Sequence, residues 1–394
     1  MNSNKILESW IIKVQLPILR TLLLCTSFLL KYNIFCIHSG FDKNELYKNV
    51  KIKTEKIKYK DYYDIHIIEP EKYNNNQIKG IIYTIHGGGF ILTNSRLYLH
   101  AIEWWARYNY IIIAIDFPQS PDFKYPEAQL HILKSIKKMN SIYSNKNIKN
   151  ILLGESAGAN ISLHLALCLN NKKCLDLFKE TLIDLKLKYD NSYFDIKIDT
   201  VICHSGLFIK NNRSNKYTEK IINQVWKYYI PNKTILKCPA IVDELLNENL
   251  ITNLPDILFC TSEKDFLYND SIHLYQNIKK ISSDKKINCK IELKIMKNCF
   301  HSFNAYSSLF SFTKGMYNKS SYCAEYQLNF LDKNDSFIIL DRKKTYLTKI
   351  FNYYNDIIKL MFVILYLIPF TLTSYVPMFN LLLYKYKESN LIKT

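Results

Sequence analysis

The hydrophobic residues of the chain fall into short runs, and the segments between these runs carry apolar residues at helical spacing. Runs rich in β-branched and aromatic residues predict strands at 62–68, 78–86, 110–116, 149–153, 199–204, 255–262 and 289–296. Apolar residues that recur every three to four positions predict helices at 95–107, 126–139, 157–169 and 268–281. Strands that alternate with helices in this way favour a mostly parallel central sheet with helices on both faces.

Two long segments interrupt this alternation. Residues 171–197 contain no glycine or proline and predict a helical excursion. Residues 207–253 lack any run typical of a buried strand, so we expect a helical lid or cap inserted between two strands. The chain therefore divides into a catalytic domain at 49–335 that contains the lid, N-terminal hydrophobic or cap helices at 1–48, and a hydrophobic C-terminal segment at 336–394.

Hydrophobic segments near both ends of the chain suggest contact with a membrane. Residues 360–384 form 25 uncharged positions, long enough to cross a bilayer as a helix, although a pair of buried amphipathic helices is the alternative. Residues 21–30 form a shorter apolar run. The region 21–38, which contains this run, is compatible with a signal peptide, an anchor or cap helices. We expect membrane association, at the endoplasmic reticulum for example, with the catalytic domain on either the cytosolic or the lumenal side.

A formal net charge of +18 would ordinarily suggest a nucleic acid or an anionic surface as partner. Of the 53 basic residues, 48 are lysine and five are arginine, and they are spread along the whole chain. The composition therefore predicts no nucleic-acid partner, because the basic residues form no stripe or patch.

The ten cysteines are scattered and form no C-x-x-C pair. Several of them, such as Cys203 and Cys260, lie within runs that predict strands. Their positions predict buried free thiols and indicate neither a zinc site nor a disulfide framework.

A pattern for nucleophilic catalysis occurs at 154–158, where Gly-Glu-Ser-Ala-Gly follows a predicted strand and precedes a predicted helix. This is the G-x-S-x-G nucleophile elbow in the strand–turn–helix context that it requires. Gly154 and Gly158 flank the turn because side chains there would collide in so tight a bend. The pattern predicts Ser156 as the nucleophile.

Three consecutive glycines at 87–89 account for a third of the nine glycines in the chain. A serine nucleophile generates an oxyanion, which needs backbone N–H groups placed in advance. The backbone amides of Gly87 and Gly88, together with that of Ala157 at the start of the following helix, are predicted to form this oxyanion hole. A phosphate-binding loop is disfavoured because neither glycine-rich nucleotide motif is present.

A serine nucleophile also requires a base and an acid, which follow it along the chain in this fold. Asp265 comes directly after the predicted strand 255–262, with Glu263 and Asp270 as alternatives for the acid. His301 follows the predicted strand 289–296 and is the candidate base. Both residues lie beyond the carboxyl ends of strands, where ligands bind in open parallel sheets.

Together these motifs resemble the hormone-sensitive-lipase family of α/β-hydrolases, which includes arylacetamide and steryl deacetylases. The resemblance covers roughly residues 60–310. It rests on five segments that occur in the family's order: His-Gly-Gly-Gly-Phe at 86–90, a segment similar to D-Y-R-L-A-P-E-x-x-F-P-A at 116–128, the elbow at 154–158, Asp-Phe-Leu at 265–267 and Phe-His-Ser-Phe at 300–303. The sequence departs from the family pattern at Pro118, Glu155, Phe266 and Ser302, and none of these changes removes a catalytic group.

The resemblance implies an α/β-hydrolase fold and a carboxylic-ester hydrolase that acts on a hydrophobic acyl ester through an acyl-enzyme. It implies a Ser156–Asp265–His301 triad and no metal or organic cofactor. An amide hydrolase of the deacetylase or formamidase type uses the same triad and is the nearest alternative. A non-catalytic ligand-binding protein on the same fold is the other alternative.

Overall fold

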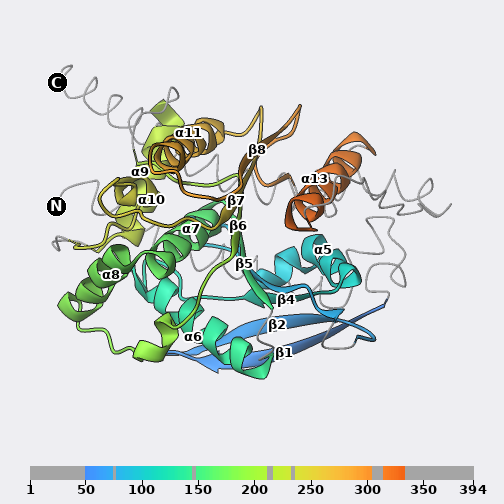
Figure 1. Cartoon of the computed structure of the whole chain (residues 1–394), viewed down its shortest axis with the longest axis horizontal. Helices are drawn as coiled ribbons and strands as arrows, with labels where there is room; N and C mark the ends of the chain where they lie inside the picture. The colour runs from blue at the N-terminus through green and yellow to red at the C-terminus, as the bar shows by residue number, and fades with distance from the viewer. Residues whose placement is uncertain are drawn as a thin grey trace, which may run out of the picture.

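An eight-stranded sheet forms the centre of the protein in a computed structural model (Figure 1). The structure describes residues 49–73, 77–143, 148–210, 216–231, 236–303 and 314–332. The strands are β1 (Val50–Lys58), β2 (Tyr62–Pro70), β3 (Gly80–Ile85), β4 (Tyr110–Ile115), β5 (Lys149–Glu155), β6 (Thr200–His204), β7 (Asp256–Ser262) and β8 (Ile291–Met296). They are arranged in the order β1-β2-β4-β3-β5-β6-β7-β8. β1–β2 and β2–β4 are antiparallel and every other neighbouring pair is parallel, which confirms the predicted mostly parallel sheet.

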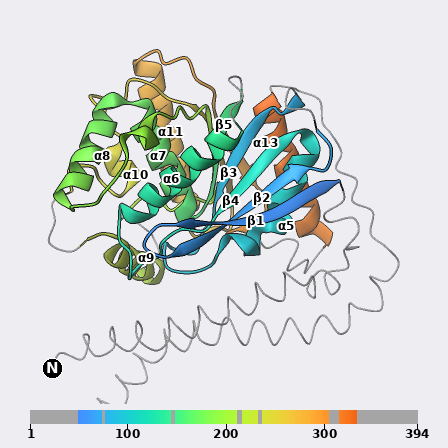
Figure 2. The same ribbon diagram turned by 90° about the horizontal axis from the view of Figure 1, so that it is seen from below.

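Helices cover both faces of this sheet (Figure 2). One face carries α6 (Glu127–Ile142), α7 (Ala157–Asn170), α8 (Lys172–Asp184), α9 (Lys216–Tyr229), α10 (Val242–Leu245) and α11 (Tyr268–Asp284). The other face carries α5 (Leu99–Ile102), the adjoining 3-10 turns η3 (Ser95–Tyr98) and η4 (Glu103–Tyr108), and α13 (Lys314–Asp332). A further turn, η5 (Asn191–Phe194), follows α8. The helical layers explain why the central strands are hydrophobic on both sides.

Alternation along each central strand supplies two separate cores. In β3, Ile81 and Tyr83 point into the core beneath α6 and α7, while Ile82 points into the core beneath α5 and α13. In β4, Ile113 points into the first of these cores and Ile112 into the second. Since all four isoleucines are at most 1% exposed, the continuous apolar runs in the sequence correspond to strands buried on both faces.

The structure differs from the predicted elements in four places, one of which is the helix α13, since no helix was predicted at 314–332. The edge strand β1 was not predicted, because only three of its nine residues, Val50, Ile52 and Ile57, are apolar and only Ile57 is buried. Residues 171–197 are helical only through Asp184 and then form a short 3-10 turn. Residues 95–107 form a succession of short 3-10 and α turns rather than one helix.

Neither predicted hydrophobic segment belongs to the described part of the chain. Residues 21–30 and 360–384 both lie outside it. Within the residues that the structure does describe, no helix combines the length and apolar character needed to cross a bilayer. Membrane association therefore stays a prediction from the sequence.

Candidate active site

Ser156 lies in the sharp turn between β5 and α7. Its backbone angles are φ 54° and ψ −115°, a strained conformation for a residue with a side chain. A Cβ on Gly154 would lie 2.3 Å from the Gly158 carbonyl oxygen, and a Cβ on Gly158 would lie 2.1 Å from the Ile85 carbonyl oxygen. Both flanking glycines are therefore required for steric reasons, as the elbow motif predicts. The Ser156 N–H donates to the His204 carbonyl oxygen at 2.8 Å, which ties the turn to β6.

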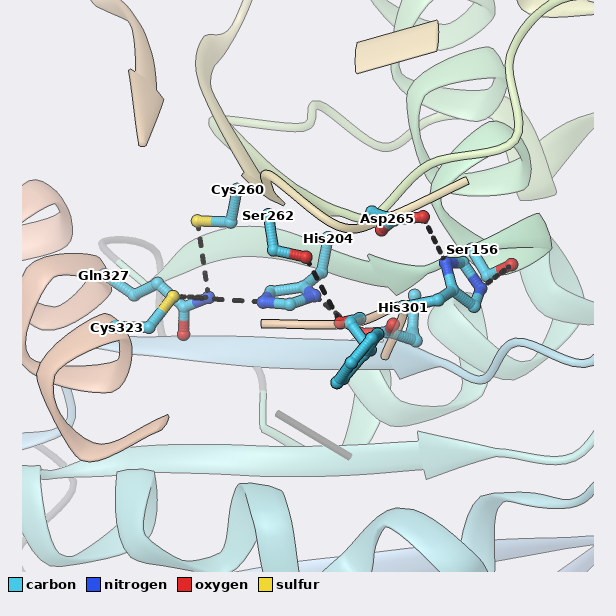
Figure 3. Close-up of polar contacts among 10 residues, drawn as sticks. Ser156, His204, Cys260, Ser262, Asp265, His301, Cys323 and Gln327 are labelled. Carbon is cyan, nitrogen blue, oxygen red and sulfur yellow. Dashed lines mark hydrogen bonds and ion pairs between the residues drawn. The ribbon is translucent and has the colours of Figure 1, made fainter. Parts of the chain in front are cut away.

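The three candidate triad residues meet at the carboxyl ends of β5, β7 and β8. His301 Nε2 lies 3.0 Å from Ser156 Oγ, and His301 Nδ1 lies 2.9 Å from Asp265 Oδ1 (Figure 3). The two alternative acids have other partners: Glu263 accepts the Asn298 N–H at 3.1 Å, and Asp270 accepts the backbone N–H groups of residues 208 and 209. Asp265 is thus the carboxylate that contacts the histidine.

Asp265 is buried, yet it is held in its charged form. Burial by itself would raise the pKa of this carboxyl, but the hydrogen bond and the charge of His301 outweigh it and leave the pKa below its usual value. The Leu267 N–H donates to Asp265 Oδ1 at 2.8 Å and acts in the same direction. A carboxylate in this position orients the imidazole and stabilises its protonated form.

The predicted oxyanion loop lies directly against Ser156. A Cβ on Gly87 would lie 3.1 Å from Ser156 Cβ, so the loop backbone approaches the serine closely. Gly88 has φ 100°, where a Cβ would lie 2.1 Å from the Leu92 carbonyl oxygen. Within the described part of the chain, the N–H groups of Gly87, Gly88 and Ala157 have no hydrogen-bond acceptor. These amides are available to an incoming ligand.

Side chains behind the loop fix its orientation. The Thr93 hydroxyl donates to the Gly87 carbonyl oxygen at 2.7 Å, and His86 Nδ1 lies 2.8 Å from the same oxygen and 3.0 Å from Thr93 Oγ1. Burial lowers the pKa of His86 to about 4, so the ring is neutral, and its Nδ1–H is the donor because the Thr93 proton is already used. The sequence gives no signal for Thr93, since its role depends on φ 75° in the loop.

Comparisons with known proteins identify the family of the fold. Residues 82–305, more than half of the chain, match the family model described as alpha/beta hydrolase fold. The chain belongs to this family. The resemblance to hormone-sensitive-lipase-type hydrolases is thereby confirmed as a matter of family.

Curated relatives of this α/β-hydrolase are distant. It is 27% identical over 235 residues to the vegetative-specific protein H5 of Dictyostelium discoideum, a match that covers 52% of this chain and 60% of that protein. It is 27% identical over 244 residues to an acetyl esterase of Salmonella schwarzengrund, a match that covers 59% of this chain and 67% of the esterase. The chain therefore spans 60% and 67% of the length of these two relatives.

Solved structures show the same fold at lower sequence identity. A hyperthermophilic esterase from Pyrobaculum calidifontis superimposes with a TM-score of 0.56 at 13% identity, over 84% of this chain and 96% of that one. The esterase LipW from Mycobacterium marinum superimposes with a TM-score of 0.57 at 14% identity, over 81% of this chain and 89% of that one. At such identities the similarity shows the fold alone.

A buried ion pair lies behind the elbow of this α/β-hydrolase. Glu155 Oε2 lies 2.9 Å from His204 Nδ1, and both residues are at most 5% exposed. Burial opposes a charge on the imidazole, but the Glu155 carboxylate outweighs it and raises the pKa of His204 to about 10. On the far side of the His204 ring, Cys323 Sγ of α13 lies 3.9 Å from His204 Nε2, and Gln327 of the same helix donates to this sulfur (Figure 3). The sequence offers no spacing that would predict this pair.

The predicted lid contributes α9, which packs against the glycine loop. Val225 lies about 3.5 Å from where a Cβ on Gly89 would stand, and the Phe90 ring stacks on Tyr229 with centroids 3.7 Å apart. Beside the candidate triad, the centroids of the Phe266 and His301 rings lie 4.4 Å apart. The reacting groups are therefore bordered by apolar and aromatic side chains.

Proposed function

We propose that this α/β-hydrolase is a serine carboxylesterase with Ser156, His301 and Asp265 as its catalytic triad. The observation that carries the proposal is the continuous pair of contacts from Ser156 Oγ to His301 Nε2 and from His301 Nδ1 to Asp265 Oδ1. The acetyl esterases among its relatives support an ester as the substrate class.

The chemistry follows from these contacts. His301 Nε2 takes the proton of Ser156 as Oγ attacks the ester carbonyl carbon, and Asp265 stabilises the imidazolium that forms. The N–H groups of Gly87, Gly88 and Ala157 would stabilise the oxyanion of the tetrahedral intermediate. His301 then protonates the departing alcohol, which leaves an acyl group on Ser156. A water molecule, deprotonated by His301, attacks this acyl-enzyme and releases the acid.

Aromatic side chains favour a substrate with a hydrophobic part. Phe266 directly follows Asp265 and Phe300 directly precedes His301 in the sequence, and the two side chains are 51% and 58% exposed. Large aromatic rings this exposed beside a reacting histidine offer apolar surface to the alcohol portion of an ester. Phe266 stands where the family that the sequence resembles usually has proline.

A fluorophosphonate probe tests the proposed nucleophile. It should label the purified protein at Ser156, and both Ser156→Ala and His301→Ala should abolish the labelling. Full labelling of the Ser156→Ala protein would refute the assignment. Hydrolysis of acyl esters that differ in chain length and alcohol, each compared with its matched amide, separates esterase from amidase activity.

A further inference from the structure

A cluster of one imidazole and two thiols lies in the core between α7 and the cap, away from the proposed active site. His164 and Cys168 are one turn apart on α7, and Cys238 comes from the segment between α9 and α10. All three side chains are at most 1% exposed. A polar cluster buried this completely needs partners, and here the three side chains are partners of one another.

The sulfur–sulfur distance and one sulfur–nitrogen distance within the cluster match those between ligands of one metal ion. With metal–sulfur bonds of about 2.3 Å and metal–nitrogen bonds of about 2.0 Å, tetrahedral geometry places two sulfurs about 3.8 Å apart and a sulfur about 3.5 Å from a nitrogen. The two sulfurs of Cys168 and Cys238 are 3.9 Å apart. Cys238 Sγ lies 3.5 Å from His164 Nε2, whereas Cys168 Sγ lies 3.8 Å from the other ring nitrogen, Nδ1, and one ion can bind only one of these nitrogens. One donor atom from each residue lies within 4.8 Å of the other two.

Oxygen atoms complete the surroundings on the same side of the ring. The Tyr125 hydroxyl and the Pro239 carbonyl oxygen lie 3.1 Å and 3.0 Å from His164 Nε2, and the Nε2–H donates to the carbonyl. An ion bound at Nε2 would replace this proton, and either oxygen could then occupy a fourth position. Two thiolates cancel the charge of a divalent cation, which makes such a site neutral and therefore acceptable in an apolar core.

We propose that His164, Cys168 and Cys238 bind one thiophilic metal ion of the zinc class. Imidazole nitrogen and thiolate sulfur are the ligands that zinc prefers in structural sites. The sequence showed no zinc motif because only His164 and Cys168 are close in the chain, and the third ligand comes from 70 residues further on. The ion would join α7, which begins directly after Ser156, to the chain that returns from α9.

Metal analysis of the full-length protein, purified without a histidine tag, tests the site. After incubation with zinc and removal of the excess, mass spectrometry of the metal content should give about one equivalent per chain. Cobalt(II) loaded in place of zinc should give the thiolate-to-cobalt charge-transfer band and the intense visible bands of tetrahedral coordination. Chelation should lower the unfolding temperature, because an ion bound only to the native state stabilises it.

Two variants make the test specific. Cys238→Ser should lose the zinc equivalent and the charge-transfer band. Cys174→Ser should retain both, because this buried thiol lies nearby but hydrogen-bonds to the Leu250 carbonyl oxygen instead. Near-UV circular dichroism establishes that each variant is folded.

Three results would overturn the proposal. The first is folded wild-type protein with less than about a tenth of an equivalent of zinc after loading. The second is undiminished zinc binding by folded Cys238→Ser. The third is a Cys168–Cys238 disulfide in peptide maps of the freshly purified protein, since bonded sulfurs about 2.05 Å apart leave no thiolate for a metal.

Discussion

The Thr93 hydroxyl determines which way the peptide between Gly87 and Gly88 faces. It donates to the Gly87 carbonyl oxygen at 2.7 Å, alongside the His86 ring. Because the C=O and N–H of a trans peptide point in opposite directions, holding this oxygen turns the Gly88 N–H away from Thr93. We expect Thr93→Val to loosen that orientation and to slow ester hydrolysis, while its similar shape preserves the packing.

The size of the effect follows from the single hydrogen bond removed. A neutral hydrogen bond contributes about 1 kcal/mol, within about 0.5–1.5 kcal/mol, because protein–water bonds replace it when it is lost. At about 1.36 kcal/mol for each tenfold change in rate, activity should fall about fivefold, within a range of about two- to thirteenfold. The oxyanion exists only along the reaction path, so the loss should appear in kcat and leave KM nearly unchanged.

Steady-state hydrolysis of p-nitrophenyl acetate provides the assay. Thr93→Ser is the matched control, since it keeps the hydroxyl and should retain most of the wild-type kcat. The reasoning would be refuted if Thr93→Val kept the full wild-type kcat, or if its entire loss lay in KM. Either result would mean that the glycine loop keeps its orientation without this donor.

Three further predictions concern stability and location. Because the pKa of His204 is raised from 6.5 to about 10, its contribution to stability should be complete below about pH 6.5 and lost as the pH rises through about 10. The free energy of unfolding, measured with urea between pH 6 and pH 10, should therefore fall with pH in the wild type. This pH dependence should be absent in His204→Gln. Gly158→Ala should lower the free energy of unfolding by about 3 kcal/mol or more, since its Cβ would overlap the Ile85 carbonyl oxygen. Gly89→Ala should lower it by about 1 kcal/mol, because only its positive φ is unfavourable there. Thermal unfolding of both variants measures the difference. Deletion of 357–394 should release the protein from membranes, and continued sedimentation with membranes would contradict a C-terminal anchor.

The sequence predicted the proposed reacting groups because the topology brings them together. In a parallel sheet, the carboxyl ends of all the strands lie at one edge, so residues that follow β3, β5, β7 and β8 share that edge. Gly87, Ser156, Asp265 and His301 each follow one of these strands within a few residues. Their order along the chain and the buried character of the strands were enough to place them in one region.

Other features could not be predicted, and each has its own physical reason. Glu155 and His204 lie at the ends of two neighbouring strands, and only the register between β5 and β6 pairs them. The role of Thr93 requires a backbone conformation that β-branched residues rarely adopt. The edge strand β1 has little buried surface, so its hydrophobic pattern is too weak to distinguish it from a loop.

The helix α7 connects the nucleophile to the cap through a single stripe of polar residues. Asn160, His164 and Cys168 are spaced four residues apart and therefore lie on one face of the helix. Asn160 donates to the Ala240 carbonyl oxygen at 3.0 Å and accepts the N–H of residue 242 at 3.0 Å, while His164 and Cys168 contact Cys238. All of these contacts reach the short segment 238–242 that follows α9. Because α9 packs on the glycine loop, a bound metal at this stripe would act on the substrate site by holding the cap in place.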